Sequence, residues 1–307
     1  MSVAGPRGST DGRVAVIDGV VLAPEDAKVS VYDRGFLFGD AVFEVLRTYG
    51  GAPFAFDEHF DRLRRSAERV FIEVPFDRGT LREEVTRGIA AAGNAESYVR
   101  ILVTRGAGPM SLDPATATRA LRVILVEPVV PPPPAAYTDG IAVVTVHTRR
   151  SVDETAAAGA KVTNYLESLL AVREAKARGG QEALIVDGRG EVVEGATSNV
   201  FVVKDARVAT PPPEAGILVG ITRAHVLDAA GRLGMPVEER RLRPGDLRDA
   251  DEVFITSSIR ELLPVVRVDG RAIGSGVPGP VARALHRAFR VAAGVGDRPM
   301  PWEAPTP

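Results

Sequence analysis

Hydrophobic and polar positions repeat along this chain with two periods, and these periods predict strands and helices in both halves. Residues 40–49 alternate at every second position, which is typical of a strand whose two faces are used differently. Residues 57–70 carry apolar side chains at helical spacing, which predicts an amphipathic helix. Short apolar runs on both sides of Asp18-Gly19 predict a hairpin that turns at this pair.

The same patterns predict the remaining elements. Further strands are expected at residues 98–104, 121–126, 141–147, 183–187 and 252–256. Further helices are expected at residues 81–92, 166–178, 222–233 and 280–293. The second of these helices carries Leu166, Leu169 and Leu170 at helical spacing. Because strands and helices occur together in each half, with hairpins prominent, the predicted fold class is α+β.

A proline-rich stretch divides the chain. Residues 131–134 are consecutive prolines, which cannot donate hydrogen bonds to a sheet and favour a stiff, extended link. We therefore predict an interdomain linker at residues 128–137. The other predicted parts are a flexible arm (1–12), a small N-terminal α/β domain (13–127), a larger C-terminal domain (138–297) and a tail (298–307).

Composition excludes several classes of function. With 45% hydrophobic and 25% charged residues, the 307-residue chain is typical of a globular protein that can bury a sizeable core. A formal net charge of −2 gives no reason to expect nucleic acid or an anionic membrane as a partner. The chain has no cysteine, which excludes disulfides and thiol nucleophiles. No signal peptide or membrane-spanning run is visible, so the expected location is cytoplasmic.

Most motifs of known chemistry are missing. The four histidines are scattered and none forms H-E-x-x-H, so a zinc hydrolase is not expected and no metal site is predicted. No G-x-G-x-x-G follows a strand, and neither a Walker loop nor a G-x-S-x-G turn occurs.

Lys161 and Glu194 are the two candidate residues at the ends of one compact stretch. Lys161 is either a solvated lysine or a functional amine, and its apolar neighbours favour the neutral form that attacks carbonyl groups. Glu194 lies in an apolar run, as a surface residue of an edge strand or as a carboxylate partner for a pyridinium nitrogen.

Three further residues would suit a phosphate group. Ile221 and Thr222 follow Gly220 at a predicted helix N-terminus, where backbone N–H groups favour an anion. Arg62 on the helix at residues 57–70 offers a bidentate contact, although a plain surface ion pair is the alternative.

These residues occur together with a series of short motifs whose order and spacing are specific. The motifs are Tyr32-Asp33-Arg34-Gly35, residues 38–44, 58–63, 161–166 and 194–201, Gly220-Ile221-Thr222-Arg223, residues 251–254 and Pro264-Val265. In this respect the chain resembles the fold-type IV pyridoxal-phosphate enzymes, which include branched-chain aminotransferases, D-amino acid aminotransferases and aminodeoxychorismate lyases. The resemblance covers residues 29–266 and implies a small N-terminal α/β domain with a larger C-terminal pseudo-barrel.

The resemblance also implies a cofactor, pyridoxal 5′-phosphate, and roles for individual residues. Lys161 is similar to the Schiff-base lysine that carries the substrate α-proton, and Glu194 to the carboxylate at the pyridine nitrogen. Tyr165 is similar to the tyrosine that hydrogen-bonds the ring 3′-oxygen, and Leu218 to the residue packed on the ring. The residues similar to the phosphate cup are Arg62, Ile221, Thr222 and Ser258.

Substrate specificity is less defined. The residues matching substrate positions of the family are Phe38, Phe43, Arg47, Tyr98, Arg100, Ser257, Ile259 and Arg260. Phe43, Arg47, Tyr98 and Arg100 favour a branched-chain substrate, and the Arg-x-His carboxylate trap of D-amino acid enzymes is missing at residues 110–112. Against this, Val45 replaces a glycine of the branched-chain motif, and residues 256–260 are similar to D-amino acid enzymes and lyases. Arg260 is either a surface charge or a ligand of a substrate carboxylate.

The function implied is a transaminase that moves an amino group between an amino acid, with branched-chain type favoured, and a keto acid such as 2-oxoglutarate. The alternatives are a D-amino acid or (R)-amine transaminase, a 4-amino-4-deoxychorismate lyase, and a non-catalytic binding protein that has kept the fold. Members of the family are dimers in which residues near Phe38 reach toward the partner's site, so the resemblance also implies a homodimer.

Overall fold

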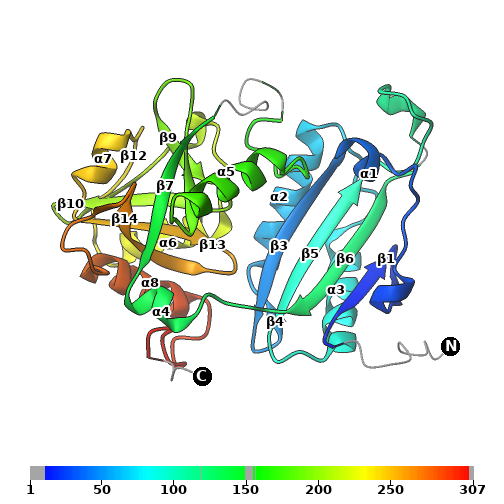
Figure 1. The fold of residues 1–307 in the computed structure, drawn as a ribbon. Coiled ribbons are helices and arrows are strands. Elements are labelled where there is room, and N and C mark those ends of the chain that lie inside the picture. The colour runs from blue at the N-terminus through cyan, green and yellow to red at the C-terminus, as the bar shows by residue number, and fades with distance from the viewer. Residues whose placement is uncertain (1–10, 118, 149–154, 156, 304–307) are drawn as a thin grey trace. The chain divides into compact units, whose positions relative to one another are not determined.

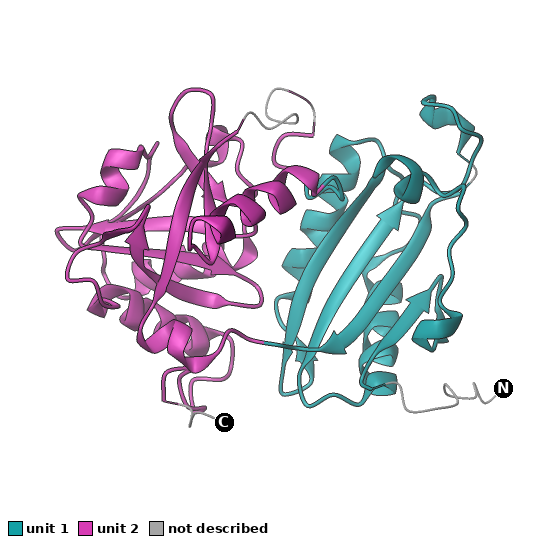
Figure 2. Ribbon diagram, in the orientation of Figure 1, with its two compact units in different colours: residues 1–130, 160–164 teal, residues 131–159, 165–307 magenta. Residues whose placement is uncertain are grey.

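The computed structural model describes residues 11–117, 119–148, 155 and 157–303. Most of the predicted arm (1–12) and the end of the predicted tail (298–307) lie outside the described residues. The chain divides into two compact units, shown in Figure 2. Unit 1 comprises Met1–Val130 and Ala160–Asn164, and unit 2 comprises Pro131–Gly159 and Tyr165–Pro307.

Unit 1 is built on a six-stranded antiparallel sheet in the order β2-β1-β6-β5-β3-β4 (Figure 1). Its strands are β1 (Val14–Ile17), β2 (Val20–Leu22), β3 (Ala41–Tyr49), β4 (Ala52–Pro53), β5 (Ser97–Thr104) and β6 (Leu121–Pro128). The predicted hairpin at Asp18-Gly19 is confirmed, and both residues have positive φ, as the tight turn between twisted strands requires.

Helices α2 (Phe56–Arg69) and α3 (Arg78–Ala92) cover one face of this sheet (Figure 1). Helix α3 begins where the Asp77 side chain accepts a hydrogen bond from the Thr80 amide, and it ends at Gly93 with φ of 67°. Fully buried side chains from both helices and the sheet form one core, including Leu46, Leu63, Leu81, Val99 and Ile124. A short helix, α1 (Arg34–Phe38), leads into β3.

Residues 160–164 belong to unit 1, whereas the predicted boundaries place them in the second domain. The reason is hydrogen bonding along the free edge of β3. The Phe43 amide donates to the Lys161 carbonyl (3.0 Å), and the Thr163 amide donates to the Ala41 carbonyl (3.1 Å). Val162 faces Val42 across an antiparallel bridge and packs against the core of unit 1.

Unit 2 contains a nine-stranded mixed sheet in the order β12-β11-β10-β13-β14-β7-β8-β9, with β15 paired to β14. Its strands are β7 (Ile141–His147), β8 (Glu182–Val186), β9 (Val192–Gly195), β10 (Asn199–Lys204), β11 (Arg207–Thr210), β12 (Val237–Glu239), β13 (Glu252–Ser257), β14 (Glu261–Val268) and β15 (Arg271–Ala272). Side chains from β7, β8, β9, β10, β11, β13 and β14 all enter one core, so the sheet curls around it.

Helices enclose the remaining apolar faces of unit 2. They are α4 (Pro134–Thr138), α5 (Leu166–Ala177), α6 (Ile221–Arg232), α7 (Pro244–Arg248) and α8 (Pro280–Ala292). One further core lies under α6 and α8, and another under α5. The structure is thus the predicted α+β fold. None of the described helices is long and apolar enough to cross a membrane.

The structure modifies the predicted linker and shows which side of α5 is buried. The predicted extended linker contains α4, which begins at Pro134 because a proline's missing N–H is not needed in the first helical turn. In α5, Leu166, Leu169 and Leu170 are 68%, 64% and 53% exposed. The buried side of α5 is made by Ala171 and Ala175, because small side chains let the helix lie close to the sheet.

Candidate active site

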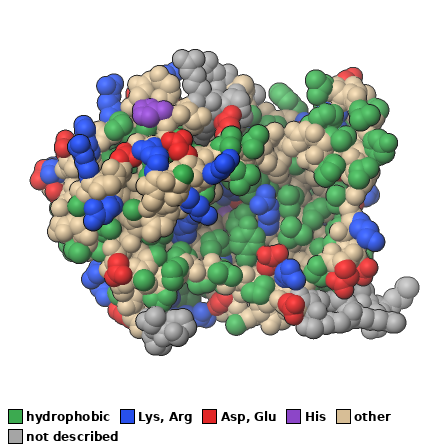
Figure 3. All heavy atoms as spheres, viewed as in Figure 1, with side chains coloured by type: hydrophobic (Ala, Val, Ile, Leu, Met, Phe, Trp, Pro, Cys, Tyr) green, Lys and Arg blue, Asp and Glu red, His purple; other side chains and the backbone are tan. Residues whose placement is uncertain are grey.

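The two faces of the unit 1 sheet carry different chemistry. Along β3, Val42, Glu44 and Leu46 face the helices, and the residues between them face the opposite side. On that opposite side, Phe43 lies across from Leu102, and Val45 lies across from Arg100. Figure 3 views this face, where hydrophobic side chains are interspersed with single Lys or Arg side chains.

Lys161 joins this face at the free edge of β3. Its Nζ lies 4.5 Å from the centroid of the Phe43 ring, and the Arg100 guanidinium carbon lies 4.2 Å from the same ring. Arg47 and Tyr98 face each other farther along the same pair of strands. The structure therefore places the predicted catalytic lysine beside Phe43 and Arg100, with the predicted substrate residues Arg47 and Tyr98 on the same face of unit 1.

The backbone around Lys161 is fixed on both sides. The Lys161 amide donates to the Ser66 hydroxyl of α2 (3.1 Å), and its carbonyl accepts from Phe43 as described above. The Asn164 side chain donates to the carbonyl of Phe38 (3.3 Å), which ends α1. A side chain at Gly39 would collide with Asn164, because its Cβ would lie 2.7 Å from Nδ2. Residues 161–164 thus fix the backbone position of Lys161 and also contact Phe38 at the end of α1.

Arg62, on α2, is buried on the helix-covered side of the sheet. The alternative of a plain surface ion pair is therefore excluded. Arg62 Nε and Nη2 donate to the two Glu44 oxygens at 2.7 and 2.6 Å. His59 Nδ1 lies 2.7 Å from Glu44 Oε2. The motif containing Glu44 was noticed in the sequence, but its role as the partner of Arg62 was missed.

The charges of this cluster set its protonation. Burial raises the pKa of Glu44, but the charge and hydrogen bonds of Arg62 outweigh it, and together with His59 they lower the pKa from 4.5 to about 2. For His59, burial lowers the pKa, and the positive charges of Arg62 and Lys161 lower it further. The hydrogen bond and negative charge of Glu44 oppose this shift, but the pKa stays below its usual value of 6.5. His59 is therefore neutral and Glu44 ionised near neutral pH, which leaves Arg62 charged and held in a fixed orientation.

In unit 2, Glu194 and Leu218 are in direct contact. Glu194 lies in β9, and its Oε2 accepts a hydrogen bond from the Leu218 amide (3.1 Å). The Leu218 carbonyl accepts from the Asn199 side chain (2.8 Å). Two predicted cofactor residues are therefore joined, and Asn199 is a further member of the site that the sequence reasoning did not single out.

The N-terminus of α6 comes shortly after Leu218 in the chain. Gly220 is its N-cap, and Ile221 and Thr222 are its first two residues, both buried. A side chain at Gly220 has no room, because its Cβ would lie 2.0 Å from Asn199 Oδ1. No side chain in the described part of the chain caps this helix end, so its first N–H groups remain available to an anion.

Four predicted residues lie where β13 leads into β14: Ser257 ends β13, and Ser258, Ile259 and Arg260 form the turn. The strand before it contains Thr256, which faces Asn199 and whose buried hydroxyl has no hydrogen-bond partner among the described residues. Arg260 is paired with Glu182 and Thr197. Tyr165 is the residue before α5, and its carbonyl accepts a hydrogen bond from the Leu169 amide (2.9 Å).

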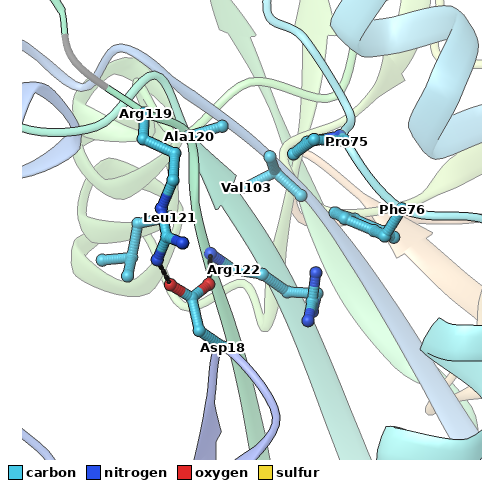
Figure 4. A pocket seen from close by; sticks show the side chains of 8 residues that line it. All are labelled: Asp18, Pro75, Phe76, Val103, Arg119, Ala120, Leu121 and Arg122. Atoms are coloured by element: carbon cyan, nitrogen blue, oxygen red, sulfur yellow. Dashed lines mark hydrogen bonds and ion pairs between the residues drawn. The ribbon is translucent and has the colours of Figure 1, made fainter.

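A shallow pocket elsewhere in unit 1 contains none of the predicted site residues (Figure 4). It is lined by Asp18, Pro75, Phe76, Val103, Arg119, Ala120, Leu121 and Arg122. Its charged groups are already engaged: Arg119 with Asp18, and Arg122 with Glu84. No group of three or more potential metal ligands occurs among the described residues.

Each unit, taken by itself, carries donors that match groups of pyridoxal phosphate. The cofactor has an aldehyde, a basic ring nitrogen and a phosphate, and each needs a different partner. Unit 1 supplies a primary amine beside an apolar face and a fixed guanidinium. Unit 2 supplies a carboxylate in a buried strand, an uncapped helix N-terminus and, among its described residues, a buried hydroxyl without a partner at Thr256. Each unit by itself thus carries donors that suit pyridoxal phosphate, which points to an enzyme dependent on this cofactor.

Comparisons with known proteins specify the family. Residues 41–268 match the model of the class IV amino-transferases. The chain is 38% identical to a putative branched-chain-amino-acid aminotransferase of Methanocaldococcus jannaschii, with 89% of this chain and 94% of the relative covered. It is 31% identical to the D-alanine aminotransferase of Bacillus licheniformis, with 90% and 95% covered.

Solved structures agree. The branched-chain amino acid aminotransferase of Escherichia coli is 32% identical and superposes with a TM-score of 0.88, covering 96% of this chain and 99% of that one. The corresponding T.th. enzyme, complexed with N-(5′-phosphopyridoxyl)-L-glutamate, is 31% identical, with a TM-score of 0.86 and 98% of each chain covered. The chain belongs to the class IV aminotransferases, and it is a transaminase whose cofactor is pyridoxal 5′-phosphate.

Proposed function

We propose that this enzyme transfers the amino group of a branched-chain amino acid to a keto acid such as 2-oxoglutarate. The observation that carries the proposal is the apolar face of unit 1, where Lys161 Nζ lies over Phe43. Leu102 and Val45 extend the same face, which suits an aliphatic side chain better than a charged one. The similarity to the Methanocaldococcus jannaschii relative supports the same substrate class.

Lys161 is the proposed catalytic residue. Its amine would hold the cofactor aldehyde, and once the substrate amine has displaced it, the released neutral amine would accept the substrate α-proton and later give it up. When bound, pyridoxal phosphate withdraws electrons from the substrate α-carbon, which makes that proton removable. The backbone contacts to Ser66 and Phe43 fix the origin of the side chain, so the amine reaches the proton from one side.

The remaining cofactor residues have proposed roles that follow from their chemistry. Glu194 binds the protonated ring nitrogen, and its bond to the Leu218 amide limits its movement. Tyr165 binds the ring oxygen, and Leu218 packs on the ring. The phosphate is bound by Arg62, Ser258 and the Ile221 and Thr222 amides, which combine a guanidinium with neutral donors.

Substrate binding is assigned to residues on the sheet face and the β13–β14 turn. Arg100 presents a guanidinium beside Phe43, where an α-carboxylate can be bound, and Tyr98 lies on the same face of the sheet, across from Arg47. The other proposed substrate residues are Phe38, Arg47, Ser257 and Ile259. Arg260 differs from these residues, because its guanidinium is already paired with Glu182.

A homodimer is part of the proposal. In unit 1, Val31, Tyr32, Phe36, Met110 and Leu112 are large apolar residues with more than half of their surface exposed. Their two segments are tied together, because buried Arg34 donates to the carbonyls of Ser111 (2.6 Å) and Leu112 (3.4 Å). A fixed apolar surface of this kind is typical of a protein interface. Sedimentation velocity tests the dimer, and a monomer at micromolar concentration would contradict it.

The site is tested by the Lys161→Ala variant. We expect the visible absorbance band of lysine-bound cofactor and the transaminase activity to disappear together. The matched control is Lys176→Ala, which removes an exposed lysine of α5 and is expected to change neither. Activity that survives in the Lys161→Ala variant would contradict the assignment.

The D-alanine aminotransferase relatives support a second candidate, a D-amino acid transaminase. A panel of L- and D-amino acids, followed as single half-reactions, separates the two candidates. Rates with L-leucine, L-isoleucine and L-valine that exceed the rates with all D-amino acids by tenfold or more, about 1.4 kcal/mol, would support the branched-chain proposal. The reverse order would replace it with the second candidate.

A further inference from the structure

Glu182, at the start of β8, is the most deeply buried carboxylate among the described residues of unit 2. Its side chain is 1% exposed. Its Oε2 accepts a hydrogen bond from the Thr197 hydroxyl (2.9 Å) and is paired with Arg260. Its other oxygen, Oε1, is buried without a partner among the described residues. A buried carboxylate is strongly destabilising without a cation, so Glu182 requires Arg260.

Arg260 is held from several directions. Its Nη1 contacts both the Glu182 carboxylate and the Thr197 hydroxyl (3.0 Å), which closes a three-residue network. Its carbonyl accepts a hydrogen bond from the Tyr137 hydroxyl (3.0 Å), and its amide lies 3.4 Å from the Ser257 hydroxyl. Both the backbone and the guanidinium of Arg260 are therefore fixed.

The next residue, Glu261, is fixed as well. Its φ is +57°, a backbone conformation that side chains other than glycine rarely adopt. Its carboxylate is 2.6 Å from His286 Nε2 and 3.3 Å from Arg290 Nη1, both on α8. The turn that carries Ser257, Ser258 and Ile259 thus ends in two neighbouring residues that are each tied to a different part of unit 2.

We propose that Arg260 is a positioning residue: paired with Glu182 and Thr197, it fixes the β13–β14 turn so that Ser257 and Ser258 are held ready for their ligands. This proposal rests on the assignment of that turn to the cofactor and substrate site. Arg260 is consequently not a ligand of a substrate carboxylate, because its positive charge is already compensated by Glu182. The network also joins the turn to Thr197, three residues after Glu194, so two parts of the site are coupled.

A double-mutant cycle tests the pair through cofactor affinity. Apo-protein is titrated with pyridoxal phosphate for the wild type, Arg260→Met, Glu182→Gln and the double variant. Arg260→Met leaves a buried carboxylate unpaired, so we expect its dissociation constant to rise about tenfold or more. Adding Glu182→Gln removes that charge, and the double variant should recover at least half of the loss on a logarithmic scale. Arg260→Lys, which keeps the charge, should lose less than Arg260→Met and serves where Arg260→Met does not fold.

The matched control is the exposed pair Asp228 and Arg232 on α6. Arg232→Met, Asp228→Asn and their combination should change the cofactor dissociation constant by less than twofold and show no coupling, because an exposed ion pair contributes little. The melting temperature of each apo-protein is measured in parallel. Neither measurement requires turnover, so the test of Arg260 remains valid if the proposed substrate is wrong.

Keto-acid kinetics separate positioning from direct binding. A positioning role predicts that Arg260→Met changes KM for 2-oxoglutarate and pyruvate by the same factor, alongside the weaker cofactor affinity. The proposal is overturned if cofactor affinity is unchanged while KM rises for either keto acid, which would make Arg260 a substrate ligand. It is also overturned if the effects at positions 182 and 260 on cofactor affinity simply add.

Discussion

The Glu44→Gln substitution tests whether the buried cluster in unit 1 serves Arg62. The glutamine keeps the size of the side chain but removes the negative charge. It also replaces one acceptor oxygen by a nitrogen that cannot accept the hydrogen bonds of Arg62, whose two nitrogens donate at 2.7 and 2.6 Å to the two Glu44 oxygens. The substitution therefore leaves a buried guanidinium without its counter-charge.

Two independent arguments give the magnitude. Removing one partner of a buried ion pair typically costs about 3–5 kcal/mol. The pKa of Glu44 falls from 4.5 to about 2, and a change of about 2.5 units corresponds to roughly 3 kcal/mol of folding free energy. We therefore expect Glu44→Gln to destabilise unit 1 by about 3 kcal/mol at pH 7. We also expect it to weaken pyridoxal phosphate binding at least tenfold, because Arg62 loses its fixed orientation.

The pH dependence has a defined sign. A carboxyl whose pKa is lower in the folded than in the unfolded protein stabilises the fold above the unfolded value, and this contribution disappears as pH falls through the folded value. For Glu44 the contribution is complete above about pH 5 and is lost between the unfolded value of 4.5 and about 2. The difference between wild type and Glu44→Gln should shrink over that interval.

Hydrogen exchange measured by mass spectrometry is the suitable assay, because it reports the opening free energy of each unit separately. Peptides from β3 and α2 should exchange about a hundredfold faster in Glu44→Gln at pH 7, which corresponds to about 3 kcal/mol. Peptides from β10 and β13 in unit 2 provide the internal reference. Protection of β3 and α2 within threefold of the wild type, with unchanged cofactor affinity, would refute the reasoning.

Two further substitutions test other parts of the site. Gly220→Ala would place a Cβ 2.0 Å from Asn199 Oδ1, so it should weaken pyridoxal phosphate binding at least tenfold in a fluorescence titration, and an unchanged affinity would contradict the role of this helix N-terminus. Burial lowers the pKa of His286 below 6.5 against the opposing effect of Glu261, so its unfolded form binds a proton that the folded form excludes, and stability falls as pH drops below about 6.5. His286→Gln should therefore reduce the loss of melting temperature between about pH 6.5 and 5, and an unchanged slope would contradict this interpretation.

Much of the fold was predictable because local patterns decide it. The alternation along β3 and the helical spacing of α2 each describe one element, and each is confirmed. Strand β14 was harder to predict, because Pro264 lies inside it and proline normally excludes a central strand. It is tolerated there because β14 begins to pair with β7 only at Val265, after the proline.

Candidates for the site could be named where one residue carries the chemistry, and less so where a partner does. The neighbours of Lys161 and Glu194 made them candidates, with a solvated lysine and a surface glutamate as the alternatives, and their cofactor roles stay a proposal. The roles of Glu44 and Asn199 depend on contacts with residues 18 and 19 positions away, so no local pattern reveals them. Both residues orient a neighbouring group: Glu44 orients the Arg62 guanidinium, and Asn199 orients the backbone at Leu218.

Arg260 shows why substrate specificity is harder to predict from a sequence than the fold. In the sequence it is an arginine in a polar turn, either a surface charge or a ligand of a carboxylate. Its partner Glu182 lies 78 residues earlier and is buried by the folding of the sheet, so the pair exists only in the folded chain. Because Glu182 compensates its charge, Arg260 adds little attraction for a second carboxylate. We therefore expect discrimination among amino acids to depend on the face that carries Phe43, Val45 and Arg100.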